Sequence, residues 1–205
     1  MTPFRLSLMA LFTGALSGTG VAVVMGWIDG LSRLLWGDPV LEGLDQGLPL
    51  GWSLLICGGC GLILALLHRP GPATLLPDLR ETLNDLRDPD QAPKRDELRG
   101  LLGAALAQIG GGSIGPEALM SRLAALISQR VWRGRDQRLQ EATVAGSFGL
   151  FGAPLLGGAV VGNAPAENRR LTFLDRWLPG SLGGLAGFAA FHGIESASGG
   201  SLQGL

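Results

Sequence analysis

Long stretches of this chain carry no charged side chain, and they restrict its fold more than any other feature. The five runs span residues 6–27, 46–67, 100–116, 142–166 and 177–194. The first, second and fourth exceed the roughly 20 residues that a helix needs to cross a bilayer. Glycine supplies 34 of the 205 residues, only 16% of residues are charged, and the mean hydropathy is +0.32. We therefore expect an integral membrane protein.

A soluble α/β enzyme with glycine-rich core helices is the alternative class. Such a fold needs strands, yet valine and isoleucine are sparse and no run alternates with period two. The first apolar segment is also longer than the core of a signal peptide, which favours a retained helix over a cleaved leader. The sequence predicts an all-α, polytopic membrane protein with broken, tilted helices, forming one domain over residues 1–205.

Basic residues are concentrated in two of the connections. Residues 69–99 contain six and residues 130–138 contain four, whereas residues 29–45 hold only Arg33 against four acids. By the positive-inside rule, the N-terminus and both basic connections lie in the cytoplasm, and residues 29–45 lie outside. We assign the chain to a bacterial inner membrane with several crossings, and 69–99 contains a charged cytoplasmic connection.

Glycine, proline and charged residues divide the chain into short expected helices. Their ranges are 4–28, 48–68, 76–87, 98–110, 116–131, 137–149, 152–164 and 170–192. Several are too short to cross a membrane. Broken helices at membrane depth are tolerated only where protein buries the free backbone groups or where they line a polar cavity. In transporters, such half-helices direct their partly positive N-termini at anions.

The segment GGGSIGPEALMSRL, residues 110–123, has this half-helix character. Pro116 suits the first position of a helix, where its missing N–H costs nothing. The four glycines before it allow the backbone to approach a ligand without obstruction by Cβ atoms. Close helix packing explains such glycines equally well, and it is the favoured explanation for GGCG at 58–61 and GGLAG at 183–187. The residues alone leave both explanations open for 110–115.

A second motif, GSFGLFGAPLLGGAVVG, follows the glycine-rich turn some thirty residues later. The turn matches a G-x-x-G-P loop through Gly112, Gly115 and Pro116. The second motif matches an A-A-F-N-A-P-L-A-G segment through Phe151, Ala153, Pro154, Leu155 and Gly157. In this order and spacing, the chain resembles the CLC family of chloride channels and chloride/proton antiporters. The resemblance covers the whole chain and implies the first of two inverted repeats, in a homodimer with one pore per subunit.

The resemblance implies an anion site at the glycine-rich turn. There the backbone of Gly112, Ser113, Ile114 and Gly115 would face chloride or a similar anion. Thr74 stands where a family serine coordinates the anion, although an ordinary N-cap and turn before a surface helix explains it equally well. We also expect the turn to converge with other helix starts inside the molecule.

Two positions depart from the family pattern in the same direction. Ile114 occupies the place of the gating glutamate, and Asn163 or Ala164 that of the inner proton-transfer glutamate. Because none of these side chains is acidic, the resemblance implies passive anion movement without proton exchange. Glu117, three residues further on, is a candidate gate, and an ion pair with Arg122 or a helix-end charge is its alternative role.

The remaining reactive residues predict no chemistry. Cys57 and Cys60 form a CxxC in an apolar helix without further ligands, which favours small core residues over a metal or redox site. His192 and Glu195 are too few to hold a metal. Neither a catalytic set nor a phosphate loop is present, and the net charge is −1. We therefore expect no enzyme, no cofactor and no nucleic-acid partner.

The family's second repeat supplies a GxFxP loop and a tyrosine that close the anion site, and this sequence contains no tyrosine. The expected partners are therefore the lipid bilayer, a chloride-like anion, a second copy of the chain and a second polypeptide carrying the other repeat. The alternatives are a non-conducting half-subunit or fragment, and a structural membrane protein.

Overall fold

The computed structural model describes residues 2–37, 49–68, 76–87, 96–112, 115–132, 136–163 and 172–198. The elements, in chain order, are α1 (Pro3–Trp36), α2 (Leu50–Leu67), α3 (Leu79–Arg87), α4 (Glu97–Ile109), α5 (Glu117–Trp132), α6 (Gln137–Gly146), η1 (Ser147–Phe151), α7 (Pro154–Asn163) and α8 (Phe173–Ala197). No strand occurs within the described ranges, so the predicted all-α class is confirmed.

The first helix is longer than predicted. We expected it to end near residue 28, but α1 continues to Trp36 and stops at Gly37, whose φ is 80°. Asp29 and Arg33 lie one turn apart on the same face, and the Arg33 Nε–Asp29 Oδ2 distance is 2.9 Å. Because these opposite charges pair at i,i+4 on one face, the helix continues through Asp29 and Arg33. The prediction that a connection begins at residue 29 is therefore wrong.

Side-chain caps begin several of the helices; at the start of α3, Asp78 Oδ1 accepts from the Glu81 backbone N–H at 2.7 Å. Asp96 accepts a hydrogen bond from the Arg99 backbone N–H at the start of α4. Thr172 and Asp175 form a reciprocal capping box at the start of α8, in which each side chain accepts from the backbone of the other residue. Asp136 accepts from the Arg138 backbone N–H at the start of α6. These caps explain why the breaks seen in the sequence coincide with helix starts.

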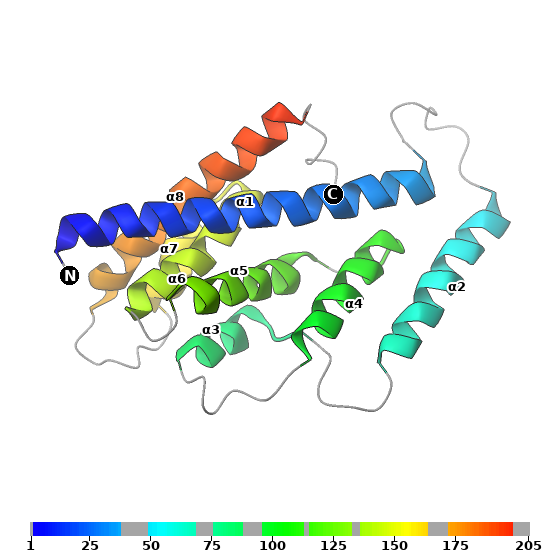
Figure 1. Ribbon diagram of the computed structural model, residues 1–205, viewed down its shortest axis with the longest axis horizontal. Coiled ribbons are helices and arrows are strands. Elements are labelled where there is room, and N and C mark those ends of the chain that lie inside the picture. Colours follow the sequence, from blue (N-terminus) through cyan, green and yellow to red (C-terminus); the bar gives the residue numbers. More distant parts are fainter. Residues whose placement is uncertain are drawn as a thin grey trace.

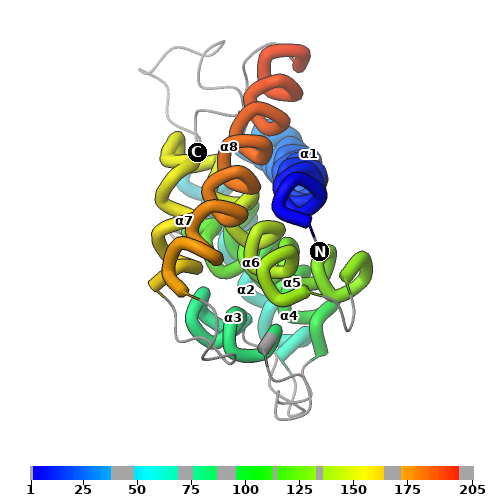
Figure 2. The backbone as a smooth tube through the Cα atoms, turned by 90° about the vertical axis from the view of Figure 1, so that its left-hand side faces the viewer, coloured from blue at the N-terminus to red at the C-terminus, as the bar shows by residue number. Residues whose placement is uncertain are grey.

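Helix α1 runs along most of the length of the molecule, and α8 crosses it at an angle (Figure 1). These two helices form the most extensive helix pair of the described chain, followed by α7 and α6 against α8. Figure 2, which shows α1 nearly end-on, places α8 and α6 beside it. Helix α2 stands at one end of the molecule and packs mainly on α4.

Helices α1, α6 and α8 meet in a glycine seam made of Gly14, Gly18, Gly146, Gly183 and Gly187. Any Cβ added here would overlap backbone atoms of a neighbouring helix: one on Gly14 would meet Gly183, one on Gly18 would meet Gly187, and one on Gly146 would meet Gly14. Small residues spaced by four are typical of closely packed membrane helices. The packing predicted for GGLAG at 183–187 is confirmed.

The glycines of α2 behave differently. Cβ atoms added at Gly58, Gly59 or Gly61 would meet nothing within 4 Å. The packing role predicted for GGCG at 58–61 is therefore wrong for its three glycines within this chain. A glycine string has the same composition in both places, and only its position relative to a neighbouring helix decides whether it packs.

Among the described residues, two helices are long and apolar enough to cross a membrane. The most apolar 18-residue windows of α1 and α2 have mean hydropathies of 1.8 and 2.2. Only 11% of the α2 window is buried, against 44% for α1. The third long uncharged run, 142–166, is not one helix, because η1 and the left-handed Gly152 (φ 65°) separate α6 from α7.

Candidate functional site

The glycine-rich turn begins as the C-terminal end of α4. Gly111 has a φ of +82°, and its N–H donates to the Gln108 carbonyl at 3.0 Å. The Gly112 N–H donates to the Ala107 carbonyl at 2.8 Å. This pair of bonds is the Schellman motif that ends many helices with a left-handed glycine. The amide of Gly112, which we predicted to face an anion, is therefore already occupied in this structure.

A tryptophan from the end of α1 holds this turn. The Trp36 Nε1–H donates to the Ile109 carbonyl at 2.7 Å, satisfying one of the free carbonyls at the end of α4. A Cβ added to Gly111 would meet the Trp36 ring at 3.0 Å. Both its left-handed backbone and this contact require glycine at position 111.

Helix α2 contacts the same turn through its two cysteines. The Cys57 Sγ lies 3.6 Å from the Gly110 carbonyl oxygen, and a Cβ added to Gly110 would meet the Cys60 Cβ at 2.8 Å. Helix packing thus explains Gly110, which decides for this residue the choice that the sequence left open. Cys57 is exposed, so the prediction that it is a core residue is wrong.

The start of α5 carries a carboxylate that folds back over the turn. The helix begins at Glu117, one residue later than predicted, and the Met120 N–H donates to the Pro116 carbonyl at 2.9 Å. A Cβ added to Gly115 would overlap the Glu117 carboxylate and lie 2.7 Å from its Cδ. The contact places the Glu117 carboxylate beside Gly115, close to the partly positive helix start; because this carboxylate is the exposed end of a flexible side chain, it could move aside for a Cβ at position 115.

This carboxylate lies on the surface of the chain. Gly112, Gly115 and Glu117 are all exposed. Two residues further along α5, Leu119 and Met120 are buried in an apolar cluster with residues of α1, α4 and α8. Because α5 is anchored by that face, its opening turn faces outward. The expectation that the turn lies inside the molecule is not met by the chain on its own.

Three of the predicted anion-binding residues, Thr74, Ser113 and Ile114, lie outside the described residues. So does Ala164, one of the two positions compared with the inner glutamate. The other, Asn163, is the last residue of α7; it is exposed and its Nδ2 donates to the Ala159 carbonyl at 3.0 Å.

The second motif forms a tight turn followed by a helix. Gly152 adopts the left-handed conformation and Pro154 begins α7, as its ring favours. A Cβ added to Gly157 would lie 2.7 Å from the Ala145 carbonyl oxygen. In this chain the motif's glycine therefore serves the packing of α7 on α6.

A buried arginine joins three helices, and sequence reasoning missed it. Arg122 of α5 donates from Nη1 to Asp85 Oδ2 of α3 at 3.0 Å and from Nε to Glu97 Oε2 of α4 at 2.7 Å. Its Nη2 also contacts Glu97 Oε1. The predicted alternative pairing of Glu117 with Arg122 is wrong, because the Arg122 guanidinium binds Asp85 and Glu97 instead.

A second buried ion pair joins α6 to α8. The Arg176 guanidinium donates to both Glu141 carboxylate oxygens, at 2.8 and 2.7 Å, and both side chains are only 2% exposed. Gln137 Nε2 donates to the same carboxylate at 2.8 Å. A signal was present in the sequence: Glu141 and Arg176 each directly precede a long uncharged run. Charges beside apolar segments usually have a partner.

A third ion pair lies at the start of α6, outside the two candidate spans. Asp136 caps the helix by accepting from the Arg138 backbone N–H at 3.1 Å, and the Arg138 Nη2–Asp136 Oδ2 distance is 2.6 Å. The side-chain hydrogen bond from Arg138 lowers the pKa of Asp136 below its ordinary value. The start of α6 is thus capped by a carboxylate that stays ionised.

The cluster at the end of α8 is a histidine–carboxylate pair. His192 Nδ1 lies 2.7 Å from Glu195 Oε2, and the His192 ring meets the Phe188 ring edge-on with centroids 4.2 Å apart. Among the described residues, no group of three or more His, Cys, Asp or Glu side chains is placed to hold a metal ion.

No protein-family model matches the chain, and no curated protein sequence matches it either. Over the residues that the structure describes, the chain is all-helical, and two of these helices, α1 and α2, are long and apolar enough to cross a membrane.

Proposed function

We propose that this chain is one half of a membrane-embedded protein for passive anion transport, in which the start of α5 holds a chloride-like anion. The carrying observation is the Glu117 carboxylate over Gly115 at that helix start. A negatively charged group is stabilised there by the helix dipole and the free N–H groups of the first turn. An anion would occupy the same position when the carboxylate leaves.

Membrane embedding is supported by how the helices pack and by what they expose. The glycine seam brings helix backbones into contact, an arrangement that gains little from the hydrophobic effect and is typical of bilayer proteins. Helix α2 exposes most of an 18-residue apolar surface. The exposed fractions of Leu54, Leu55 and Leu62 are 63–64%, a surface suited to lipid.

The exposure of the opening turn supports the proposal that the chain is a half. Gly115 and Glu117 face outward, so this chain alone does not enclose an anion among its described residues. A helix start in a bilayer needs a partner for its N–H groups, because lipid offers none. A second polypeptide placed against α5 would complete the site.

The absence of proton coupling follows from the residue types. Ile114 has no proton to carry, and Asn163 at the end of α7 is an amide whose Nδ2 bonds the preceding turn. Within the turn, Glu117 is the acidic side chain. Its carboxylate would compete with the anion for the helix start and would not relay protons.

The test is a flux measurement in liposomes that contain this chain together with a co-expressed second polypeptide that carries the other repeat. With valinomycin and a potassium gradient, the expected result is chloride efflux with no proportional proton uptake, and faster efflux for Glu117→Gln because the competing charge is gone. Glu81→Gln, which changes an exposed acid of α3, is the control and should leave efflux unchanged. Proton uptake in a fixed ratio to chloride would exclude passive transport.

The exposed turn also favours a second candidate function, a half-subunit that does not conduct. Its signature is that chloride efflux stays at the level of empty liposomes for the wild-type chain and for Glu117→Gln alike. That result would overturn conduction by this chain while leaving its membrane location intact.

A further inference from the structure

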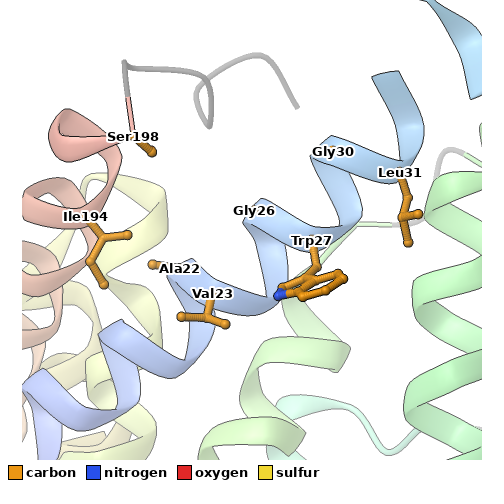
Figure 3. A pocket seen from close by; sticks show the side chains of 8 residues that line it. All are labelled: Ala22, Val23, Gly26, Trp27, Gly30, Leu31, Ile194 and Ser198. Carbon is orange, nitrogen blue, oxygen red and sulfur yellow. The ribbon is translucent and has the colours of Figure 1, made fainter. Parts of the chain in front are cut away.

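We infer that Cys57 and Cys60 of α2 form a reversible oxidation site, at which a low-molecular-weight disulfide converts the two thiols into one intrahelical disulfide. The inference goes beyond the proposed function and uses neither membrane location nor anion transport. The groove between α1 and α8 offers no such chemistry, because none of its lining side chains is a thiol, imidazole, amine or carboxylate (Figure 3). Both thiols of α2 are free, and the proposed anion site does not use them.

Both sulfur atoms lie on the side of α2 that faces the end of α4. The Cys57 Sγ is 3.6 Å from the Gly110 carbonyl oxygen, and the Cys60 Sγ is 3.1 Å from the position that a Gly110 Cβ would take. Residues three apart in an α-helix have Cα atoms about 5 Å apart. A disulfide joins Cα atoms that are about 4.4–6.8 Å apart, so the helix brings these two residues within its reach.

The two residues between the cysteines are glycines that no packing requires. Cβ atoms added to Gly58 or Gly59 would meet nothing within 4 Å. Residues one helical turn apart have Cβ atoms about 5–6 Å apart, whereas a disulfide needs about 3.5–4.5 Å. The turn from Cys57 to Cys60 must therefore tighten by about 1 Å, and glycine permits such a backbone change more readily than other residues.

The exposure of the two thiols sets the order in which they react. Cys57 is exposed and Cys60 is partly buried, so the Cys57 sulfur attacks the small disulfide first. The S–S bond of the reagent breaks, and one small thiol leaves with the Cys57 proton. The Cys60 sulfur then displaces the second small thiol, which takes the Cys60 proton, and the intrahelical S–S bond closes. The protein has lost two electrons and two protons, and the small disulfide has become two thiols.

Oxidation also removes a contact between α2 and α4. A Cys57 sulfur in a disulfide has no hydrogen to donate to the Gly110 carbonyl. Trp36 donates to the neighbouring Ile109 carbonyl, so its fluorescence reports on this end of α4. With Trp36 as the only tryptophan, oxidation should shift the emission and reduction should restore it, and a Cys57→Ser/Cys60→Ser protein should not respond. Unchanged emission of the oxidised protein would contradict this step.

Thiol counting with dithiodipyridine, a small aromatic disulfide, tests the inference on the whole chain in detergent. The expected result is the release of two thiopyridone molecules per chain, a protein mass lower by two hydrogens, and full reversal by dithiothreitol. Cys60→Ser should release one thiopyridone and keep the other as an adduct, because the closing step is absent. Two adducts on the unchanged protein, a covalent dimer, or no release would overturn the inference.

A further set of variants tests the role of the two glycines. Replacing Gly58 and Gly59 together by alanine stiffens the turn, and because both Cβ positions are open the chain should still fold. The second thiopyridone release should slow about ten-fold, whereas the first should keep its rate. Gly61→Ala is the matched control: its Cβ position is equally open, but it lies outside the turn, so both rates should stay unchanged. A second release that is equally fast in all these proteins would contradict closure through a glycine turn.

Discussion

Gly14 of α1 and Gly183 of α8 touch through their backbones, so a Cβ on Gly14 would overlap the Gly183 carbonyl group. The obstructing atoms are backbone atoms, and a rotamer change cannot remove the conflict. The helices would have to separate, and with them α6, whose Gly146 contacts Gly14. Overpacking of this kind costs about 1–3 kcal/mol, occasionally more.

We predict that Gly14→Val lowers the unfolding free energy in detergent by about 3 kcal/mol. Gly59→Val provides the control, because its Cβ position is open, and we expect a change of about 0.5 kcal/mol or less. Equal effects of the two substitutions would show that α1 and α8 are not in backbone contact.

The Arg176–Glu141 pair gives a second prediction. Because both side chains are buried, removing one partner leaves a charge in an apolar environment. Glu141→Leu or Arg176→Met alone should lower the unfolding free energy by about 3–5 kcal/mol. The double variant Glu141→Leu with Arg176→Met should recover much of this loss, which a double-mutant cycle measures. A strictly additive double variant would contradict a direct pair.

The lowered pKa of Asp136 gives a prediction about pH. A carboxyl whose folded pKa lies below its unfolded value of about 3.9 stabilises the fold above that value. This contribution is lost as the pH falls through the folded pKa. Asp136→Asn keeps an oxygen that caps α6 but removes the charge, so it should flatten the decline of thermal stability in the acid range below about pH 4.

Asp136→Ala is the companion variant, because it also removes the cap. It should cost about 1 kcal/mol at neutral pH. If Asp136→Asn shows the same acid decline as the unchanged protein, other carboxyl groups cause it.

Local sequence signals predicted most of the helices, because the signals that start and stop them are local. Pro116 and the glycines before it placed the start of α5 within one residue, and Thr172 opens α8 as a capping residue does. The end of α1 was missed because Asp29 looked like the start of a loop. The Asp29–Arg33 pair that keeps the helix intact depends on their shared face.

The candidate site was less predictable, because its chemistry depends on neighbours distant in the sequence. Three glycines in a row do not reveal that the Gly112 N–H donates to the Ala107 carbonyl or that the Trp36 ring packs on Gly111. In the same way, Arg122 has charged residues nearer in the sequence than Asp85 and Glu97, the two that it binds. Glu117 was singled out correctly as an acid at the helix start, but the structure was needed to place its carboxylate over Gly115.

Anion binding at the start of α5, which is the central claim, can be measured through the fluorescence of Trp36. Its ring lies against Gly111, four residues before Gly115, which makes it a natural reporter of this turn. The protein for this test keeps Trp36 and carries phenylalanine at the other four tryptophan positions. A matched protein keeps only Trp52, which is exposed on α2.

At constant ionic strength, we predict that iodide quenching of Trp36 fluorescence saturates and is reversed by chloride. In Glu117→Gln, the quenching should saturate at a lower iodide concentration. Quenching of Trp52 should rise linearly with iodide concentration and should not depend on chloride. Linear, chloride-independent quenching of Trp36 that Glu117→Gln leaves unchanged would contradict anion binding at this turn.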